Sequence, residues 1–330
     1  MGSSRASFIG AAAAGALAAF APCDALRAAI EKPSFTIGTA VDSPTQLPLY
    51  LAVARTFKEQ GLDVKALGFR GDAEVAQALA GGSIDVCLAS STGLINLISA
   101  GQPAVGFYAG FNQADFAWVA QSSIKSWRDL KGKNIGVSTF GSLTDVITRY
   151  VLKKNGLTPE KDVQIIQAGG SPSAFSAMKS SKLQAAIMNA PFKWEALDLG
   201  FTLLGTQARD VSPGWPKHLY YAKKAFVDGY PETVTALLRA HVAAIRLARS
   251  DRALAVKTYV DRLKFDETYA NRAYDEAMPG YDERGHLPEK SMATFWKLTI
   301  ENGDVKEPWP DAKFLDARWV DSFNRWAPKA

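Results

Sequence analysis

Short apolar runs alternate with amphipathic stretches along the first two thirds of this chain. The strand-like runs cover residues 34–41, 64–69, 84–89, 104–109, 134–138, 163–167 and 185–189. The helix-like stretches between them cover residues 49–60, 73–80, 93–100, 143–155 and 173–180. Gly61 and Gly156 stand where a helix end favours left-handed backbone. Strand–helix alternation with short connections predicts an α/β fold with mainly parallel sheets.

The same strand–helix pattern occurs twice. I-G-T-A-V-D-S (37–43), a helix and G-L-D-V correspond to I-G-V-S-T-F-G-S (135–142), a helix and G-L-T-P. Each block therefore predicts a lobe whose helices begin at the carboxyl ends of its strands, the edge where open α/β sheets bind ligands. Two such edges facing each other would form a cleft. Beyond Lys223 the pattern is mostly helical, and we expect these helices, over 231–250, 251–264, 267–277, 289–301 and 315–326, to pack on the first lobe.

A basic residue and a long run of small apolar residues stand at the N-terminus. Arg5 precedes the run from Phe8 to Ala21, which is shorter than the ~20 apolar residues of a membrane-spanning helix. This pattern predicts a signal peptide over residues 1–29 and a periplasmic location. Pro22 precedes Cys23 in place of a small residue, which argues against lipid anchoring at Cys23.

Charge and cysteine content narrow the possible functions. The 330 residues include 38 Lys and Arg and 33 Asp and Glu. The leader carries two of the basic residues and one of the acidic residues, so the mature chain keeps a mild positive charge that does not indicate a nucleic-acid partner. Cys87 lies in an apolar strand and is expected to be a buried hydrophobic residue. The two cysteines of the full chain predict no disulfide framework and no metal cluster.

Hydroxyl residues follow the strand at 84–89, where the next helix starts. Ser90, Ser91 and Thr92 stand beside free backbone N–H groups and the positive end of the helix dipole. Such a turn can hold a small anion without a catalytic group, although N-capping alone is an alternative interpretation. Ser43 and Ser142 also precede helices, so we expect a small ligand with an acidic or strongly polar head.

Other side chains allow two interpretations each. Arg70 is placed to clamp a carboxylate or sulfonate, or to pair with Asp72 at the surface. Five aromatic side chains could wall a pocket or belong to the core. They are Phe69, Phe140, Phe192, Trp194 and Trp215. The three histidines lack metal-ligand spacing, and His241 is expected to be a packed core residue. No nucleotide-binding or hydrolase motif occurs.

Five segments, in this order, resemble the substrate-binding proteins of ABC importers, specifically the nitrate/sulfonate/taurine and thiamine-precursor-like group. They are P-L-Y-L-A-V-A-R-T-F-K-E-Q-G-L-D-V (48–64), A-L-A-G-G-S-I-D-V (78–86), A-G-Q-P (100–103), W-R-D-L-K-G-K-N-I-G-V (127–137) and Y-V-L-K-K-N-G-L (150–157). The resemblance implies a two-lobed type II periplasmic-binding-protein fold. Lobe 1 would comprise 30–112 and 211–330, lobe 2 would comprise 113–210, and the crossover segments would lie near 108–117 and 206–221.

The resemblance also implies a function and a ligand site. The chain would bind a small sulfonate-, nitrate- or carboxylate-like anion between its lobes and deliver it to ABC permease subunits, as a monomer without cofactor, metal or catalysis. Carried over by position, the ligand-binding residues would be Ser43, Gln46, Leu47, Arg70, Gly71, Ser90, Ser91, Thr92, Thr139, Phe140, Gly141, Ser142, Leu143, Gly170, Ser171 and Asn189.

Three alternatives stay open at this point. The ligand could be a thiamine-pyrimidine precursor or another heteroaromatic molecule. An enzyme on the same fold would need an acid or base in the cleft, for which Asp42, Asp72 and Asp145 are candidates; the Cys-rich iron motif of the eukaryotic pyrimidine synthases of this fold is absent from the sequence. A sensory module of a regulator usually carries an attached DNA-binding or membrane segment, which we do not find in the sequence.

Overall fold

The computed structural model describes residues 29–329. The predicted signal peptide, apart from its last residue, and Cys23 lie outside this part of the chain. Within residues 29–329, none of the helices combines the length and apolar character that a membrane crossing requires.

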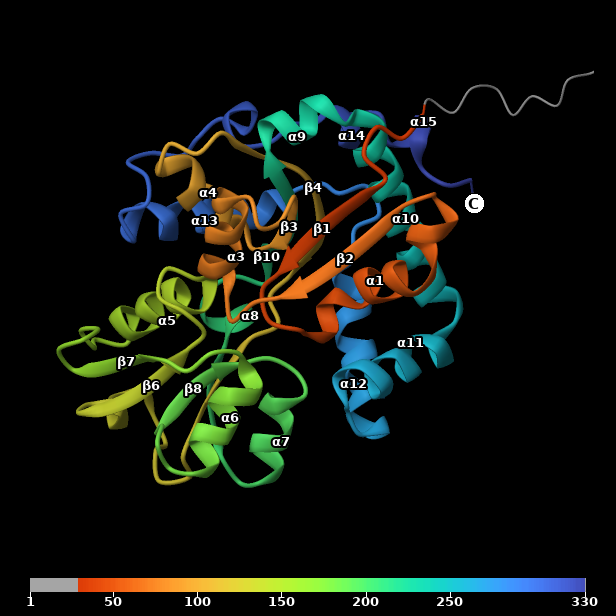
Figure 1. Ribbon diagram of the computed structural model, residues 1–330. Helices are drawn as coiled ribbons and strands as arrows, with labels where there is room; N and C mark the ends of the chain where they lie inside the picture. The colour runs from red at the N-terminus through yellow and green to blue at the C-terminus, as the bar shows by residue number, and fades with distance from the viewer. Residues whose placement is uncertain (1–28, 330) are drawn as a thin grey trace, which may run out of the picture.

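Two five-stranded sheets define two lobes (Figure 1). The sheet of the first lobe has the order β2-β1-β3-β10-β4, and that of the second lobe has the order β7-β6-β8-β5-β9. The strands are β1 Ser34–Thr39, β2 Asp63–Gly68, β3 Val86–Ala89, β4 Ala104–Gln113, β5 Ala117–Ala120, β6 Lys133–Val137, β7 Val163–Gln167, β8 Ala185–Met188, β9 Thr202–Thr206 and β10 Gly214–Lys223. The predicted two-lobed α/β architecture is confirmed, and the two lobes share one topology.

Each sheet contains one strand that runs against the others. β1 pairs in parallel with β2 and β3, and β6 pairs in parallel with β7 and β8. β10 is antiparallel to β3 and β4, and β5 is antiparallel to β8 and β9. The chain enters β5 directly from the first lobe through residues 114–116, and it returns to β10 through residues 207–213. Each antiparallel strand is thus the one that arrives from the other lobe.

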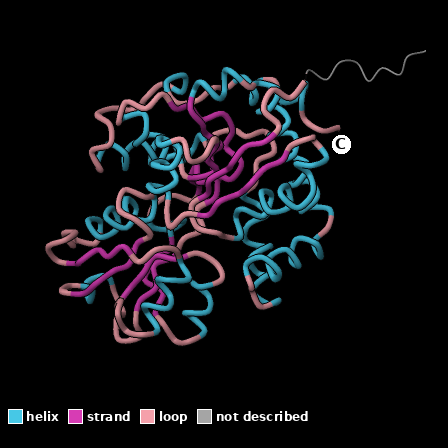
Figure 2. The backbone as a smooth tube through the Cα atoms, in the orientation of Figure 1, coloured by secondary structure: helices cyan, strands magenta, loops and turns pink. Residues whose placement is uncertain are grey.

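Helices cover the faces of both sheets (Figure 2). Those of the first pass through the two lobes are α1 Leu47–Leu51, α2 Phe57–Glu59, α3 Asp72–Gly81, α4 Ser91–Ser99, α5 Leu143–Lys154, α6 Ser171–Lys179, α7 Phe192–Asp198 and α8 Gln207–Asp210. The C-terminal helices are α9 Lys224–Gly229, α10 Pro231–Ser250, α11 Arg252–Thr258, α12 Glu267–Ala277, α13 Glu289–Glu301, α14 Arg318–Asp321 and α15 Phe323–Trp326.

The structure corrects several predicted elements. The helices expected at 49–60 and 251–264 each contain a π-helical turn, at 52–56 and 259–263. The helix expected at 315–326 is divided at Ser322 into α14 and α15. The Ser322 hydroxyl donates to the Arg318 carbonyl (2.6 Å), and the Trp326 indole donates to the Trp319 carbonyl (2.7 Å). A serine hydroxyl bonded to the carbonyl four residues earlier favours a bend in a helix. β10 escaped prediction because nearly all its residues are buried, so it shows no alternation of polar and apolar positions.

The C-terminal helices pack on the first lobe as expected, but α12 and α13 also contact the second lobe. α10 packs against α1, and α14 packs against β4. α13 contacts β10 but also α5 of the second lobe, where Lys297 Nζ lies 5.7 Å from the centre of the Tyr150 ring. The tail therefore touches both lobes.

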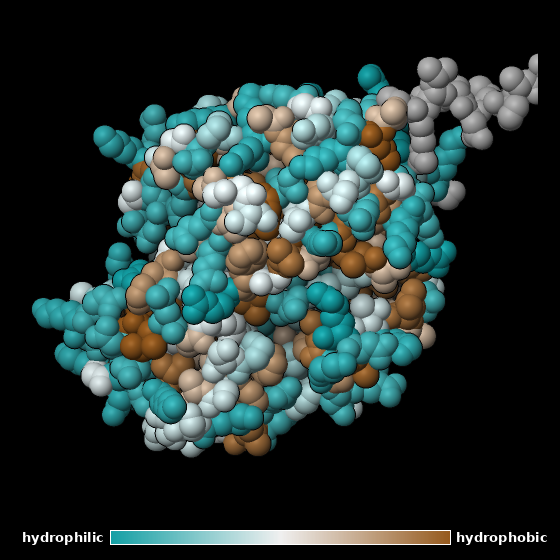
Figure 3. Space-filling model, in the orientation of Figure 1, coloured by the Kyte–Doolittle hydropathy of each residue, from teal (hydrophilic) through white to brown (hydrophobic). Residues whose placement is uncertain are grey.

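Apolar side chains fill the spaces between sheets and helices. The face shown in Figure 3 is largely hydrophilic, with apolar residues in scattered patches.

His241 of α10 lies inside the core with 2% of its surface exposed, which confirms its predicted place. Its Nδ1 shares a hydrogen bond of 3.0 Å with the Tyr220 hydroxyl.

The burial of His241 predicts a loss of stability in acid. Burial lowers the pKa of His241 to about 3, whereas an unfolded histidine titrates near pH ~6.5. Between these values the unfolded chain binds a proton that the folded chain does not, so stability falls as the pH falls below ~6.5. From pH 7 to pH 5, the wild type should lose about 2 kcal/mol more unfolding free energy than His241→Gln.

Urea denaturation at both pH values measures this difference. The exposed His286 provides the control, and His286→Gln should follow the wild type. Equal pH dependence in the wild type and His241→Gln would contradict the prediction.

Candidate functional site

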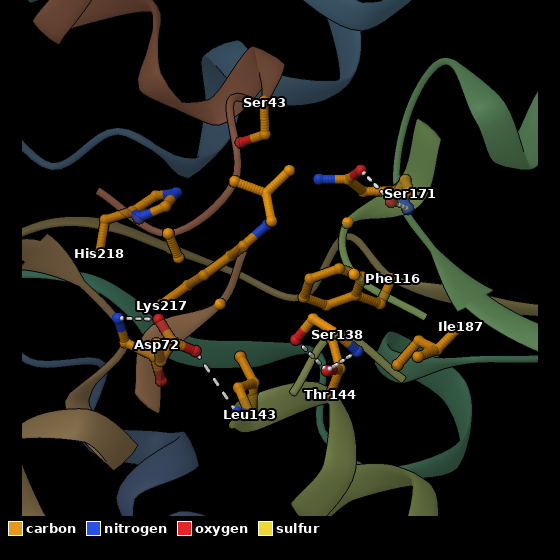
Figure 4. Close-up of a pocket in the computed structure, with 17 residues that line it drawn as sticks. Ser43, Asp72, Phe116, Ser138, Leu143, Thr144, Ser171, Ile187, Lys217 and His218 are labelled. Carbon is orange, nitrogen blue, oxygen red and sulfur yellow. Dashed lines mark hydrogen bonds between the residues drawn. The ribbon is translucent and has the colours of Figure 1, made fainter. Parts of the chain in front are cut away.

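A cavity of about 60 Å³ lies between the lobes (Figure 4). Its volume exceeds what one water molecule needs. Residues of the first lobe, the second lobe and the connecting segment 114–116 all contribute to its wall. They are Ala40, Val41, Ser43, Gly71, Asp72, Ser90, Phe116, Ser138, Leu143, Thr144, Gly169, Gly170, Ser171, Ile187, Asn189, Lys217 and His218.

The topology explains why these residues meet. In the first lobe, the lining segments follow β1 and β3 and precede α3. In the second lobe, they follow β6, β7 and β8. In each lobe they form the carboxyl edge of the parallel strands, where helices α3 to α6 begin. The cavity therefore lies at the edge where open α/β sheets bind ligands, and the corresponding edge of the other lobe faces it.

Asp72 joins the two lobes across the cavity. The Ser90 N–H of the first lobe donates to Asp72 Oδ1 at 3.0 Å, and the Leu143 N–H of the second lobe donates to Oδ2 at 3.4 Å. Burial raises the pKa of Asp72, while these hydrogen bonds and the charge of Lys217 act in the opposite direction. The carboxylate thus stands at the N-termini of both α4 and α5, where a negative charge is stabilised.

Buried charges of alternating sign lie beside the cavity. Lys217 Nζ donates to Asp115 Oδ1 at 2.5 Å, and the two side chains are only 6% and 5% exposed. Lys193 Nζ donates to the Asp115 carbonyl at 2.8 Å and forms an ion pair with Glu276. Burial lowers the pKa of Lys217, and Asp115 opposes that effect. Lys217 reaches the cavity wall beside Phe116, whose ring centre is 4.4 Å from its Nζ.

His218 contributes a neutral imidazole to the wall. Its Nε2 shares a hydrogen bond of 2.7 Å with Thr45 Oγ1, which in turn contacts Ser43 Oγ at 2.8 Å. Burial, followed by the charge of Lys217, holds the pKa of His218 well below its usual range. Its Nδ1 is buried and has no hydrogen-bond partner among residues 29–329. A ligand in the cavity could supply that partner.

Two glycines allow the lobes to approach closely. A Cβ added at Gly71 would overlap Thr139 Oγ1 and lie 3.0 Å from Ser142 Oγ, both in the second lobe. A Cβ added at Gly170 would overlap the side chain of Val41 in the first lobe. These positions require the absence of a side chain in the arrangement seen here.

A further interlobe contact lies between α7 and α12. Lys193 pairs with Glu276, and the Tyr269 hydroxyl donates to Asp198 Oδ2 at 2.6 Å. The Trp194 ring stacks on Tyr269 with 6.4 Å between centres. The lobes therefore meet both at Asp72 and at α7, which is a closed arrangement around the cavity.

The structure brings part of the predicted site together. The predicted residues that line the cavity are Ser43, Gly71, Ser90, Leu143, Gly170, Ser171 and Asn189. Ser90 also caps α4, since its hydroxyl accepts from the Thr92 N–H at 3.2 Å. Ser171 Oγ donates to Asn189 Oδ1 at 2.7 Å, which orients that amide.

The remaining predicted residues lie outside the cavity wall. They are Gln46, Leu47, Arg70, Ser91, Thr92, Thr139, Phe140, Gly141 and Ser142. Arg70 is exposed and pairs with Glu74 one helical turn away, rather than with Asp72 or the cavity. Leu47 is a core residue, and Phe140 is 47% exposed.

Local hydrogen bonds hold the polar members of this group. The Gln46 amide donates to the Ala40 carbonyl at 2.9 Å. The Ser91 hydroxyl donates to the Pro216 carbonyl at 3.0 Å, and the hydroxyls of Thr139 and Ser142 bond to each other.

The expected aromatic wall is also different. Phe69, Phe140, Phe192, Trp194 and Trp215 do not line the cavity, whereas Phe116 does. Trp215 packs on Phe295 in the core instead. The sequence prediction also missed Lys217 and His218 as site residues. Their position in the second predicted crossover segment, which must pass beside the cleft, was the available signal.

A family model described as NMT1/THI5 like matches residues 43–252 of this chain. YtlA of Bacillus subtilis (strain 168), described as a candidate binding protein, is 32% identical over 126 residues, which are 36% of this chain and 37% of that protein. A candidate binding protein of Brucella abortus (strain 2308) is 33% identical over 132 residues, 39% of each chain. The chain thus aligns with under two fifths of the length of these curated relatives.

Solved structures share the fold over most of the chain. A protein of Bordetella bronchiseptica RB50 has a TM-score of 0.77 and 27% identity, covering 90% of this chain and 99% of that one. The periplasmic nitrate-binding protein NrtA from Synechocystis PCC 6803 has a TM-score of 0.73 and 16% identity, covering 90% and 89%. The periplasmic aliphatic sulphonate-binding protein SsuA from Escherichia coli has a TM-score of 0.64 and 18% identity, covering 84% and 94%.

An enzyme also appears among the structural neighbours. A mutant of DszB, solved with biphenyl-2-sulfinic acid, has a TM-score of 0.63 and 14% identity, covering 88% of this chain and 99% of that one. The nitrate- and sulfonate-binding neighbours are binding proteins, and they carry the predicted periplasmic-binding-protein fold. From the span of the family match together with this fold, we conclude that the chain belongs to the NMT1/THI5-like family.

Proposed function

We propose that this protein is the extracytoplasmic solute-binding component of an ABC importer. It encloses a small polar ligand between its lobes and presents the closed complex to the membrane permease. The observation that carries this proposal is the interlobe cavity, whose wall draws on the carboxyl edges of both sheets. A monomer with two lobes and two connecting segments can open and close around such a site by hinge motion.

The cavity wall supports a ligand with an acidic head. Lys217 contributes a buried ammonium group, and His218 and Asn189 contribute further polar atoms. Ser138 adds a hydroxyl at the end of β6, bonded at 2.7 Å to Thr144 in the first turn of α5. Donors of this kind, fixed in a site that excludes water, hold a carboxylate or sulfonate. The nitrate- and sulfonate-binding neighbours lend this ligand class support by analogy of fold.

The alternative ligand is a heteroaromatic molecule such as a thiamine-pyrimidine precursor. Phe116 gives it some support, because its ring forms part of the wall and offers a surface for stacking. An enzymatic role has less support. Of its three candidate carboxylates, only Asp72 reaches the cavity, and both of its oxygens already accept backbone hydrogen bonds.

Ligand-dependent closure tests the proposal. Native mass spectrometry of the purified periplasmic protein should detect a small co-purified molecule. Removing that molecule by partial unfolding and dialysis, then adding it back, should reduce the radius of gyration measured by small-angle scattering. An unchanged scattering profile at saturating ligand would count against interlobe binding, and recovery of the protein from the cytoplasm alone would refute its export.

A further inference from the structure

Asp72 already occupies the two helix N-termini at which the sequence predicted the ligand anion. Its two oxygens accept the first free N–H groups at the starts of α4 and α5. An anion is stabilised at such positions by the helix dipole and the free N–H groups. A second anion placed there would have to displace a buried carboxylate that belongs to the protein itself.

Asp72 also retains unused acceptor capacity toward the cavity. An ionised carboxylate offers about four lone-pair sites, and the two backbone N–H groups use two of them. Asp72 is 7% exposed and forms part of the cavity wall. A buried carboxylate is stabilised by further hydrogen-bond donors, so a ligand group with N–H donors is complementary to this side of the cavity.

A positively charged group, the ammonium of Lys217, lines another part of the wall. The Lys217 ammonium carries three N–H donors, of which Asp115 accepts one. No ion pair joins Lys217 to Asp72 within residues 29–329. Both nevertheless line the same cavity, with His218 and Asn189 completing the polar wall. The cavity therefore has a negative pole and a positive pole that are not bonded to each other, as Figure 4 shows for Asp72 and Lys217.

We propose that Asp72 determines specificity and that the ligand is a small zwitterion, with its acidic head toward Lys217 and an ammonium group toward Asp72. This inference rests on the proposed solute-binding function and narrows its ligand class. A simple inorganic anion matches only one pole and is repelled by the other. A molecule that bears both charges places an opposite charge at each pole and leaves the Asp72 bridge between the lobes in place.

Matched pairs of probes test this assignment. The pairs are acetate with glycine, propionate with β-alanine, and butyrate with 4-aminobutyrate, which differ only by the ammonium group. Isothermal titration calorimetry on ligand-free wild-type protein should show at least one amino acid binding tenfold or more tightly than its carboxylate. The size follows from one additional charge-assisted hydrogen bond, since a tenfold change in affinity corresponds to about 1.4 kcal/mol.

The variant Asp72→Asn identifies the residue responsible. Asparagine keeps the size of the side chain and one backbone hydrogen bond but removes the charge, so the preference for the amino acid should fall below threefold. Asp251→Asn is the control, because Asp251 also accepts a backbone N–H, from Leu254 at 2.9 Å, but lies at the start of α11. That variant should keep the wild-type preference.

Equal binding of the amino acid and its carboxylate in all three pairs by the wild type would overturn the inference, and so would tight binding of nitrate. Either result would leave solute binding intact and remove only the zwitterion. An unchanged preference in Asp72→Asn would overturn the role assigned to Asp72. If none of the six probes binds, the zwitterion is rejected at these lengths, and the co-purified molecule then decides the wider function separately.

Discussion

Replacing Gly170 with alanine should weaken ligand binding about tenfold to a hundredfold while the open protein still folds. A Cβ at this position would overlap Val41 Cγ1 of the facing lobe and lie 2.8 Å from its Cγ2 and 3.1 Å from its Cβ. The φ angle of Gly170 is −70°, which alanine adopts without strain. The overlap therefore exists only when the lobes meet. Overpacking of this kind costs about 1–3 kcal/mol, and 1.4 kcal/mol is about a factor of ten in affinity.

Calorimetry with the co-purified ligand measures the effect, and small-angle scattering should show a wider ligand-bound state. Gly81→Ala is the matched control, because a Cβ at Gly81 meets nothing within 4 Å. Adding Val41→Ala to Gly170→Ala removes both overlapping methyl groups and should restore much of the affinity relative to Val41→Ala alone. Wild-type affinity and closure in Gly170→Ala would show that the lobes do not approach this closely in solution.

The sequence predicted the architecture well because the parallel strands and their helices carry strong local signals. Predicted strands at 134–138 and 163–167, for example, agree with β6 and β7 to within one residue. The turns after these strands then lie at one edge by topology alone. Gly71, Ser90, Gly170 and Asn189 could be placed in the site on that basis, because each follows or begins an element of that edge.

The rest of the site depends on contacts between lobes, which a local pattern does not encode. Thr139 and Ser142 precede α5 as expected, but their hydroxyls bond to each other and Asp72 takes the Leu143 N–H. Lys217 and His218 lie on β10, where burial on both faces removes the alternation that marks a strand. The facing lobe determines which side chain accepts the free N–H groups at a helix N-terminus. That contact can therefore be identified only in the folded structure.

Replacing Lys217 with methionine should lower the unfolding free energy by about 3–5 kcal/mol and reduce ligand affinity. The substitution leaves the carboxylate of Asp115 buried without the ammonium that lies 2.5 Å from it. Breaking a buried ion pair by removing one partner costs about this much, because the remaining charge stays uncompensated. Methionine preserves most of the side-chain volume, so the loss reports mainly on charge. Lys217 also faces Phe116 at 4.4 Å, and that cation–π contact is lost as well.

Urea denaturation of two further variants separates the buried charge from other effects. The double variant Lys217→Met with Asp115→Asn removes both charges and should recover most of the lost stability, since replacing a whole buried pair is often nearly neutral. Lys224→Met is the surface control, because its pair with Asp228 is 62% and 47% exposed, and it should cost less than ~1 kcal/mol. Ligand affinity should stay low in the double variant, because the ammonium that faces the cavity is still absent. A loss below ~1 kcal/mol in Lys217→Met would mean that water reaches Asp115, and it would place Lys217 outside the closed interior from which the acidic ligand head was inferred.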